Sequence, residues 1–229
     1  MISEHTNATP SVLASAVADE LRAAIAARGQ ATLAVSGGKS PIALFEQLRS
    51  QSLDWSRVVV MLVDERCVGH DHADSNTALA RQHLLQDAAA AARFVALFDT
   101  VPTELHDPAL QAMVDQANQR LAAVGLPLDV VVLGMGEDAH TASLFPAAPG
   151  LDNALVSAGP IAWVRPATAP HARLTLTLPV LLAARHVHLP LSGATKLKVY
   201  DEARKAANPA LPVSLLLNSP ACDVQVWLS

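Results

Sequence analysis

The chain has 229 residues, of which 51% are hydrophobic and 16% charged, and its formal net charge is −5. This composition excludes a disordered protein and predicts a globular one, long enough to bury a sizeable core. The acidic balance excludes the broad basic surface by which proteins commonly hold nucleic acid. An anionic ligand would therefore have to be bound by a few locally placed lysines and arginines.

Nothing in the sequence predicts export or a membrane span. Residues 1–29 lack the basic start of a signal peptide, and acidic residues follow their short apolar run. No run of about 18 apolar residues occurs, which is the length that a transmembrane helix needs. Cys67 and Cys222 lie far apart and fit a reducing compartment. We therefore expect a cytoplasmic protein with neither a membrane nor a nucleic-acid partner.

Helical and extended patterns alternate along the chain. Apolar residues recur at helical spacing from residue 12 to 28, where Gly29 is a stop signal. Ser40 and Pro41 predict the N-cap and the first residue of the next helix. The predicted helices span residues 12–28, 40–50, 75–85, 107–125 and 194–206. The predicted strands span residues 31–38, 57–65, 93–97, 128–134, 161–165, 173–177, 186–193 and 223–229.

The order of these elements predicts an α/β fold. The strands are nearly continuous apolar runs, as in "RVVVMLVDE", which is typical of a parallel sheet covered on both faces. We expect a single domain over residues 1–229, with a mostly parallel, Rossmann-like sheet and helices on both faces. The proline-rich segment 146–170 is interpreted as a long insertion within that domain.

Four predicted strands end in polar, glycine-rich or charged loops. In a parallel sheet the carboxyl ends of the strands meet at one edge, where ligands bind. We therefore expect the four loops to form one site. Lys196 supports this, because a cation in the first turn of a helix is disfavoured by the helix dipole unless an anion is bound nearby; an ordinary solvated lysine is the alternative. The loops are "SGGKS" (36–40), "DER" (64–66), "GMGEDAH" (134–140) and "SGATK" (192–196).

Two nucleotide-binding motifs are only partly matched. "VSGGKSP" ends like a P-loop, but Leu33 stands where that motif needs a glycine five residues before Gly38. "GMGEDAH" has the spacing of a dinucleotide-binding turn, but Pro146 follows His140 by six residues and interrupts the helix that the turn requires. The first turn suits a single phosphate group or no ligand at all. The second suits acid/base chemistry by its histidine.

A metal site has little support in the sequence. Cys67, His70 and His72 lie close together, but their spacing fits no standard zinc pattern. No second cluster supplies the remaining ligands. We therefore expect no metal and no cofactor.

The four loops together resemble the 6-phosphogluconolactonases, within the wider group that includes the glucosamine-6-phosphate isomerases. The matching segments are "LAVSGGKSP", "VDERCVGHDHADSN", "DVVVLGMGEDAHTASLFP", "RLTLTLP" and "LSGATKLKVY". They follow the family order over about residues 31–200, and the third is the most specific. The resemblance implies hydrolysis of 6-phospho-D-glucono-1,5-lactone to 6-phosphogluconate, with a sugar phosphate as the small-molecule partner and neither cofactor nor metal.

The resemblance also implies roles for individual residues. His140 would be the base that activates water, since a neutral imidazole can take up a proton near pH 7. Asp64 and Asp138 would orient His140 or hold sugar hydroxyls. The residues expected to bind the substrate and its phosphate are Ser36, Gly37, Gly38, Lys39, Arg66, Arg173 and Lys196. Which backbone donors would stabilise the oxyanion, and the oligomeric state, stay open.

The chain departs from the family pattern where Ala139 replaces the usual glycine, and a positive φ there would strain an alanine. Two alternative functions stay open. The sister isomerases (deaminases) have an acidic residue five positions after the histidine, where this chain has Phe145, which cannot transfer protons. A non-catalytic sugar-phosphate-binding protein would typically lack the histidine or add a DNA-binding segment, and this chain has His140 and no such extension.

Overall fold

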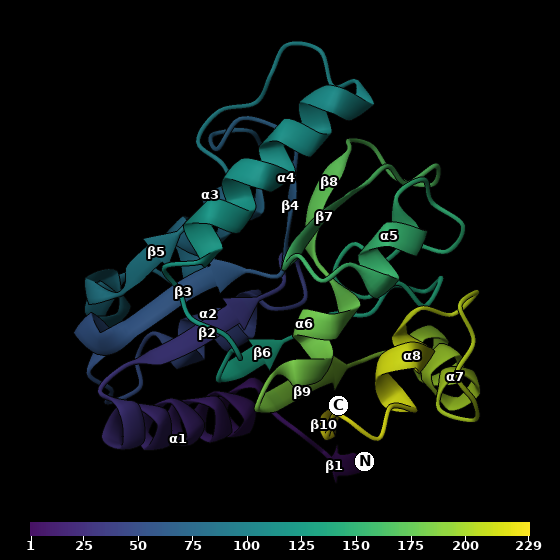
Figure 1. Ribbon diagram of the computed structural model, residues 1–229. Helices are drawn as coiled ribbons and strands as arrows, with labels where there is room; N and C mark the ends of the chain where they lie inside the picture. The colour runs from purple at the N-terminus through teal and green to yellow at the C-terminus, as the bar shows by residue number, and fades with distance from the viewer.

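The computed structural model describes residues 1–229 and contains two β-sheets (Figure 1). The main sheet has seven parallel strands in the order β1-β10-β9-β6-β2-β3-β5. Its strands are β1 Ile2–Thr6, β2 Ala31–Val35, β3 Val58–Leu62, β5 Arg93–Val95, β6 Val130–Val132, β9 His186–Leu191 and β10 Val224–Leu228. The predicted α/β architecture with a mostly parallel sheet is therefore confirmed.

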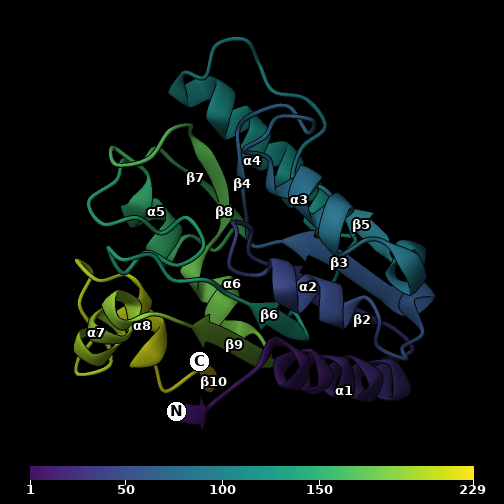
Figure 2. The same cartoon turned by 180° about the vertical axis from the view of Figure 1, so that it is seen from behind.

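Helices cover both faces of the main sheet. They are α1 Pro10–Arg28, α2 Ile42–Leu48, α3 Asn76–His83, α4 Asp107–Leu121, α5 Leu151–Val156, α6 Leu178–Ala183, α7 Ala194–Ala203 and α8 Val213–Leu217, with short 3₁₀ turns at Trp55–Arg57 and Asp87–Ala91. Figure 1 shows α1 below the sheet and α4 above it, and Figure 2 shows α1 and α2 from the other side. α5, α6 and α8 were not predicted from the sequence.

The buried strands serve two separate cores because successive side chains point to opposite faces. In β3, Val58, Val60 and Leu62 belong to a core with α1, α2 and α3. Val59 and Met61 belong to a larger core with α4 to α8 and the second sheet. This explains why the strands read as continuous apolar runs rather than alternating ones.

The ends of the first helices can be traced to local chemistry. Thr9 caps α1 by accepting a hydrogen bond from the N–H of Val12 at 3.3 Å, and Gly29 ends the helix with a φ of 77°. The prediction that Ser40 caps α2 was wrong. α2 begins one residue later than expected, with Pro41 at the cap position and no side-chain cap. A proline cannot cap a helix through its side chain, and Ser40 instead lines a cavity.

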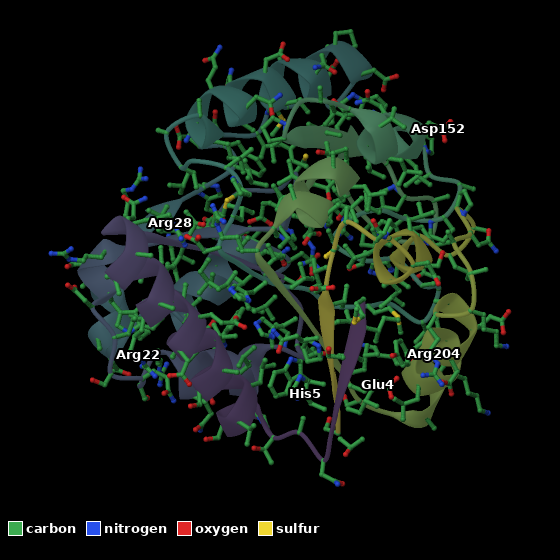
Figure 3. The ribbon with its side chains drawn as sticks, turned by 60° about the horizontal axis from the view of Figure 1, so that its bottom comes forward. Glu4, His5, Arg22, Arg28, Asp152 and Arg204 are labelled. Carbon is green, nitrogen blue, oxygen red and sulfur yellow. The ribbon has the colours of Figure 1, made fainter.

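The N-terminal strand β1 was also not predicted. It pairs in parallel with β10, so that the first and last segments of the chain lie side by side. Tyr200 donates a hydrogen bond to Glu4 at 2.6 Å, and Arg204 donates to the same carboxylate at 2.8 Å. Figure 3 shows Glu4 on β1 on the same side of the molecule as Arg204, which directly follows α7. β1 escaped detection because its side chains are mostly exposed on this edge.

The predicted strand 57–65 is in fact divided between the two sheets. The chain leaves the main sheet at Val63, whose N–H donates to Val35 while its carbonyl accepts from Leu176. The second sheet consists of β4 Asp64–Arg66, β8 Arg173–Leu176 and β7 Ile161–Val164, all antiparallel. Both ribbon views place it between α4 and α5 (Figures 1 and 2). It brings the "DER" segment and Arg173 to the carboxyl edge of the main sheet.

No helix is both long enough and apolar enough to cross a membrane.

Candidate functional site

The carboxyl ends of the parallel strands surround a cavity of about 250 Å³. All four loops singled out in the sequence contribute to it, as the parallel topology requires. The predicted site residues that line it are Ser36, Gly37, Gly38, Asp64, Arg66, His140, Arg173 and Lys196. Asp138 lies just outside, next to His140, while Lys39 is exposed and does not line the cavity.

His140 is paired with Asp138 across two residues of the same loop. Nδ1 of His140 lies 2.5 Å from Oδ1 of Asp138. An ionised carboxylate can only accept hydrogen bonds, so Nδ1 carries the proton in this pair. A neutral imidazole then keeps its free lone pair on Nε2, and His140 is part of the cavity lining. This is the tautomer that a general base needs.

Gly136, in the turn that precedes His140, leaves room for the side chains of His140 and Asp138. A side chain at Gly136 would lie 2.2 Å from Nδ1 and Cε1 of His140 and 2.5 Å from Oδ1 of Asp138. The N–H of Gly136 also donates to the carbonyl of His140 at 2.9 Å. Gly136 is therefore required by the histidine–aspartate pair. A glycine that closely approaches a pyrophosphate would have no such side-chain neighbour.

Ala139 has a φ of 64°, in the left-handed region that favours glycine. The residue is fully buried, and its carbonyl accepts a hydrogen bond from Val213 at 3.0 Å. The strain expected from the sequence is thus present, and packing against the start of α8 holds it in place.

Asp64 does not contact His140. Its carboxylate accepts a hydrogen bond from Oγ of Ser143 at 2.6 Å and lies 3.9 Å from a guanidinium nitrogen of Arg173. Asn76 adds a weaker contact at 3.5 Å. Asp64 thus connects the loop after β6, through Ser143, to an arginine of the second sheet.

Glu65 has a structural role that the sequence reasoning missed. Its carboxylate is 1% exposed and accepts hydrogen bonds from the N–H groups of Asn76 and Thr77, at 2.8 and 2.7 Å, and from the hydroxyl of Ser75. It therefore caps the start of α3. The sequence did contain a signal for this different role. Successive side chains of a strand point to opposite faces, so Glu65 cannot share a face with Asp64 and Arg66.

Asn76 was missed as well. Its side-chain amide donates to the carbonyl of Asp64 at 2.8 Å and lies against Gly37. A side chain at Gly37 would come within 1.9 Å of Oδ1 of Asn76. Gly37 is therefore a glycine because the first loop packs directly on α3. Gly38 is a glycine for another reason, its φ of 90°.

The cavity contains three cationic side chains, from Arg66, Arg173 and Lys196. Arg173 is 6% exposed; burial lowers its pKa, and Asp64 opposes that change. A guanidinium nevertheless stays protonated under physiological conditions. Arg66 is tied by a hydrogen bond to the carbonyl of Asp74. Positive charge gathered in this way in a net acidic chain suits an anionic ligand.

The sequence cluster Cys67, His70 and His72 is not assembled. Cys67 is a buried free thiol whose pKa burial raises to about 12, and His70 packs against Phe98. His72 instead lies beside Asp74 and His171, with potential ligand atoms all within 4.8 Å of one another. Of the side chains in this region, these three are the ones that could hold a metal ion.

Phe145 covers one face of the imidazole ring of His140. Its ring stacks on the imidazole of His140 with centroids 4.1 Å apart and an interplanar angle of 24°. The guanidinium carbon of Arg173 lies 5.6 Å from the centroid of the same ring. The sequence marked Phe145 only as a side chain unable to transfer protons.

The chain is similar to known proteins over nearly its whole length. A family model described as glucosamine-6-phosphate isomerases/6-phosphogluconolactonase matches residues 4–227. A 6-phosphogluconolactonase of Neisseria meningitidis is 42% identical over 230 residues, which cover 98% of this chain and 96% of that protein. One from Pseudomonas aeruginosa is 44% identical over 214 residues, covering 91% and 86%. The crystal structure of a 6-phosphogluconolactonase from Shewanella baltica has a TM-score of 0.91 and 39% identity, and the match covers 100% of this chain and 98% of that one.

Proposed function

The chain belongs to the glucosamine-6-phosphate isomerase/6-phosphogluconolactonase family, and from this premise we propose that it hydrolyses 6-phospho-D-glucono-1,5-lactone with His140 as the base. The reaction is hydrolysis of a cyclic ester to 6-phosphogluconate, a step of the oxidative pentose phosphate pathway. The observation that carries the proposal is the contact of His140 with Asp138: Nδ1 lies 2.5 Å from Oδ1, and no hydrogen bond occupies Nε2 of this cavity-lining residue. The contact favours the tautomer with its proton on Nδ1.

The proton path follows from that tautomer. Nε2 of His140 takes a proton from a water molecule as its oxygen attacks the C1 carbonyl carbon. The imidazolium that forms is stabilised by the carboxylate of Asp138. When the tetrahedral intermediate collapses, the bond between C1 and the ring oxygen breaks, and Nε2 returns the proton to that oxygen. The base is thereby regenerated within one cycle, and no step requires a cofactor.

The developing negative charge on the carbonyl oxygen must be met by fixed donors. The N–H groups of Gly134 and Gly136 already donate to Ser36 and His140, at 3.0 and 2.9 Å. They are therefore unsuited to be oxyanion donors.

The phosphate is bound by the glycine turn and the cations. Gly37 and Gly38 line the cavity, and their N–H groups donate to no acceptor of the protein. Lys196 enters the same cavity from the first turn of α7. With Arg66 and Arg173 these groups supply charge-assisted hydrogen bonds to a phosphate. Ser36 Oγ accepts the hydrogen bond of the Gly134 N–H and thereby holds that turn, while its own O–H stays free to donate to a ligand. Lys39 has no contact that supports a role.

The sister activity has less support. An isomerase of amino-sugar phosphates needs an additional acid to open the sugar ring, and the corresponding position is the apolar Phe145, stacked on His140. A non-catalytic sugar-phosphate-binding protein would have no need for the pair of His140 and Asp138. We further propose that residues 1–229 act as one domain, because the first strand pairs with the last. A cytoplasmic location agrees with two free buried thiols.

A coupled assay tests the function directly. Freshly generated 6-phosphogluconolactone is supplied, and 6-phosphogluconate is measured after correction for spontaneous hydrolysis. We expect rapid turnover of this lactone, much slower turnover of unphosphorylated glucono-1,5-lactone, and no release of ammonia from glucosamine 6-phosphate. Activity should survive prolonged dialysis against EDTA. Equal rates with both lactones would contradict the phosphate site, and turnover of glucosamine 6-phosphate would favour the sister activity.

A further inference from the structure

Phe145 is the one aromatic side chain that contacts both the proposed base and a cation of the cavity. Its ring stacks on His140, with centroids 4.1 Å apart, and carries the guanidinium of Arg173 at 5.6 Å. The side chain is buried, at 4% exposure. It therefore has a fixed position from which it can restrain its two neighbours.

The two neighbours depend on this ring to different degrees. Arg173 has other anchors: Asp64 at 3.9 Å and a hydrogen bond to the carbonyl of Pro170 at 3.2 Å. The ring of His140 has only one hydrogen bond, to Asp138, and its side chain is 29% exposed. A single hydrogen bond at Nδ1 fixes one edge of an imidazole but leaves the ring free to swing about that edge. The stack on Phe145 restrains the ring plane and hence the direction of Nε2.

We propose that Phe145 is a positioning residue for the base, and that its apolar character helps to set the reaction type. This inference rests on the proposed lactonase function. A carboxylate in its place would lie between an imidazole and a guanidinium and would pair with both. Added to the carboxylate of Asp138, it would further favour the protonated imidazole, which cannot accept a proton from water. An aromatic ring holds the histidine as firmly without stabilising that form by a full charge.

Other charged groups also surround the imidazole, so the effect of Phe145 must be separated from theirs. Those that share its two neighbouring cavities are Asp64, Arg66, Glu137, Asp138, Arg173 and Lys196. The number of charged groups around the imidazole stays the same when Phe145 is replaced by another uncharged residue. A loss of activity in such a variant therefore reports on the ring rather than on the charge balance.

The test compares Phe145→Leu, Phe145→Tyr and Phe145→Glu with the matched control Phe98→Leu. Phe98 is also buried and lies beside a histidine, His70, at 5.4 Å, but it does not line the cavity. Both leucine variants lose a buried ring, so the control reports the general effect of that loss. For each variant kcat and KM are measured with 6-phosphogluconolactone. The ring signals of His140, assigned by their absence in His140→Asn, are followed by NMR.

We expect kcat of Phe145→Leu to fall about tenfold, since a misplaced catalytic group loses rate steeply, while KM stays within about twofold because Arg173 keeps its other anchors. Phe145→Tyr should restore most of kcat. In Phe145→Glu the acid limb of the kcat/KM profile should move to higher pH. The ring-current shift of His140 should disappear in Phe145→Leu and persist in Phe98→Leu.

Two outcomes would overturn the inference. One is a Phe145→Leu enzyme whose kcat equals that of Phe98→Leu; the other is a loss that appears in KM alone. Absence of turnover in the unmodified protein would instead reject the proposed function. In that case the NMR signals still decide whether Phe145 orients His140.

Discussion

Two histidine–carboxylate pairs in this protein have nearly the same geometry and opposite consequences. In the cavity, Nδ1 of His140 lies 2.5 Å from Asp138. Between α1 and the main sheet, Nε2 of His188 on β9 lies 2.6 Å from a carboxylate oxygen of Glu20 on α1. His188 is fully buried, whereas the side chain of His140 is 29% exposed. The distance between ring and carboxylate therefore does not tell which pair can do chemistry.

The second nitrogen of each ring makes the difference. Nδ1 of His188 accepts a hydrogen bond from the indole N–H of Trp227 at 3.0 Å. Because that indole can only donate, Nδ1 has no proton and Nε2 donates to Glu20. Both nitrogens of His188 are thus occupied, and Trp227 is itself stacked on His5, which Figure 3 places on β1. The pair at His188 joins α1 to the sheet, while in the pair at His140 no hydrogen bond occupies Nε2.

The largest expected effect is on the proposed catalytic pair of His140 and Asp138. Replacing His140 by Asn should lower kcat by about 10²–10⁴-fold, because an amide keeps a hydrogen bond but cannot take up a proton. KM should change little, since the proposed phosphate ligands lie on other loops. Steady-state kinetics and a melting curve on the same sample check both statements. A near-normal kcat would refute the role of His140.

Gly136→Ala should have the next largest effect. The new methyl group would lie 2.2 Å from the imidazole and 2.5 Å from Asp138, so the pair must move apart. We expect kcat to fall about 100-fold, as for other displaced catalytic groups. Gly134→Ala is the matched control, because a methyl group there meets only Ser36 at 3.9 Å. If both variants were equally impaired, the turn would be limiting for another reason.

Charge in the cavity should contribute to binding rather than to folding. Lys196→Ala is expected to raise KM about ten- to hundredfold, since a charge-assisted hydrogen bond contributes roughly 1.5–3 kcal/mol. Its melting temperature should stay close to that of the unmodified protein. Lys198→Ala, in the same helix but exposed and outside the cavity lining, is the control. An unchanged KM for Lys196→Ala would remove this lysine from the phosphate site.

The charge of Glu20, between α1 and the main sheet, should contribute to folding rather than to turnover. Burial alone would raise the pKa of Glu20, but hydrogen bonds from His188 and Gln225 and the nearby His186 lower it overall. Glu20→Gln should therefore lower the free energy of unfolding by about 1–3 kcal/mol at pH 7, with kcat intact. The corresponding stability is present above the ordinary glutamate pKa of about 4.3 and is lost as pH falls through the lower folded value.

Urea denaturation of both proteins between pH 7 and pH 3 measures this dependence. The difference in unfolding free energy should shrink toward the acid end of the series. A constant difference across the range would mean that the charge of Glu20 does not contribute. A large fall in kcat would mean that the two histidine pairs are coupled, contrary to their separation into different parts of the fold.

The smallest effect is expected at Ala139. Glycine adopts its φ of 64° without strain, which favours Ala139→Gly by about 1 kcal/mol. The greater freedom of glycine in the unfolded chain opposes this by about 0.4–1 kcal/mol. The melting temperature should therefore change by only a few degrees, and kcat should be preserved. Strong destabilisation would indicate that the buried methyl group matters more than the backbone strain.

The sequence alone determined the alternation of strands and helices, and with it the edge at which the site lies. Continuous apolar strands, helix stops such as Gly29 and four loops after four strands suffice for this, because the side-chain period and the direction of parallel strands are local properties. The histidine at 140 and its neighbour Asp138 were also found in this way, since they are two residues apart.

Only the tertiary structure decided how the site residues are connected. Asp64 contacts Ser143 and Arg173, 79 and 109 residues away along the chain, rather than His140. The division of residues 57–65 between two sheets, the packing of Gly37 on Asn76 and the stack of Phe145 on His140 likewise join distant segments. Such contacts follow from how whole layers pack, and no periodicity within a short window encodes them. The same holds for the comparison of His140 with His188: the sequence contains both, and the fold leaves a free nitrogen on only one.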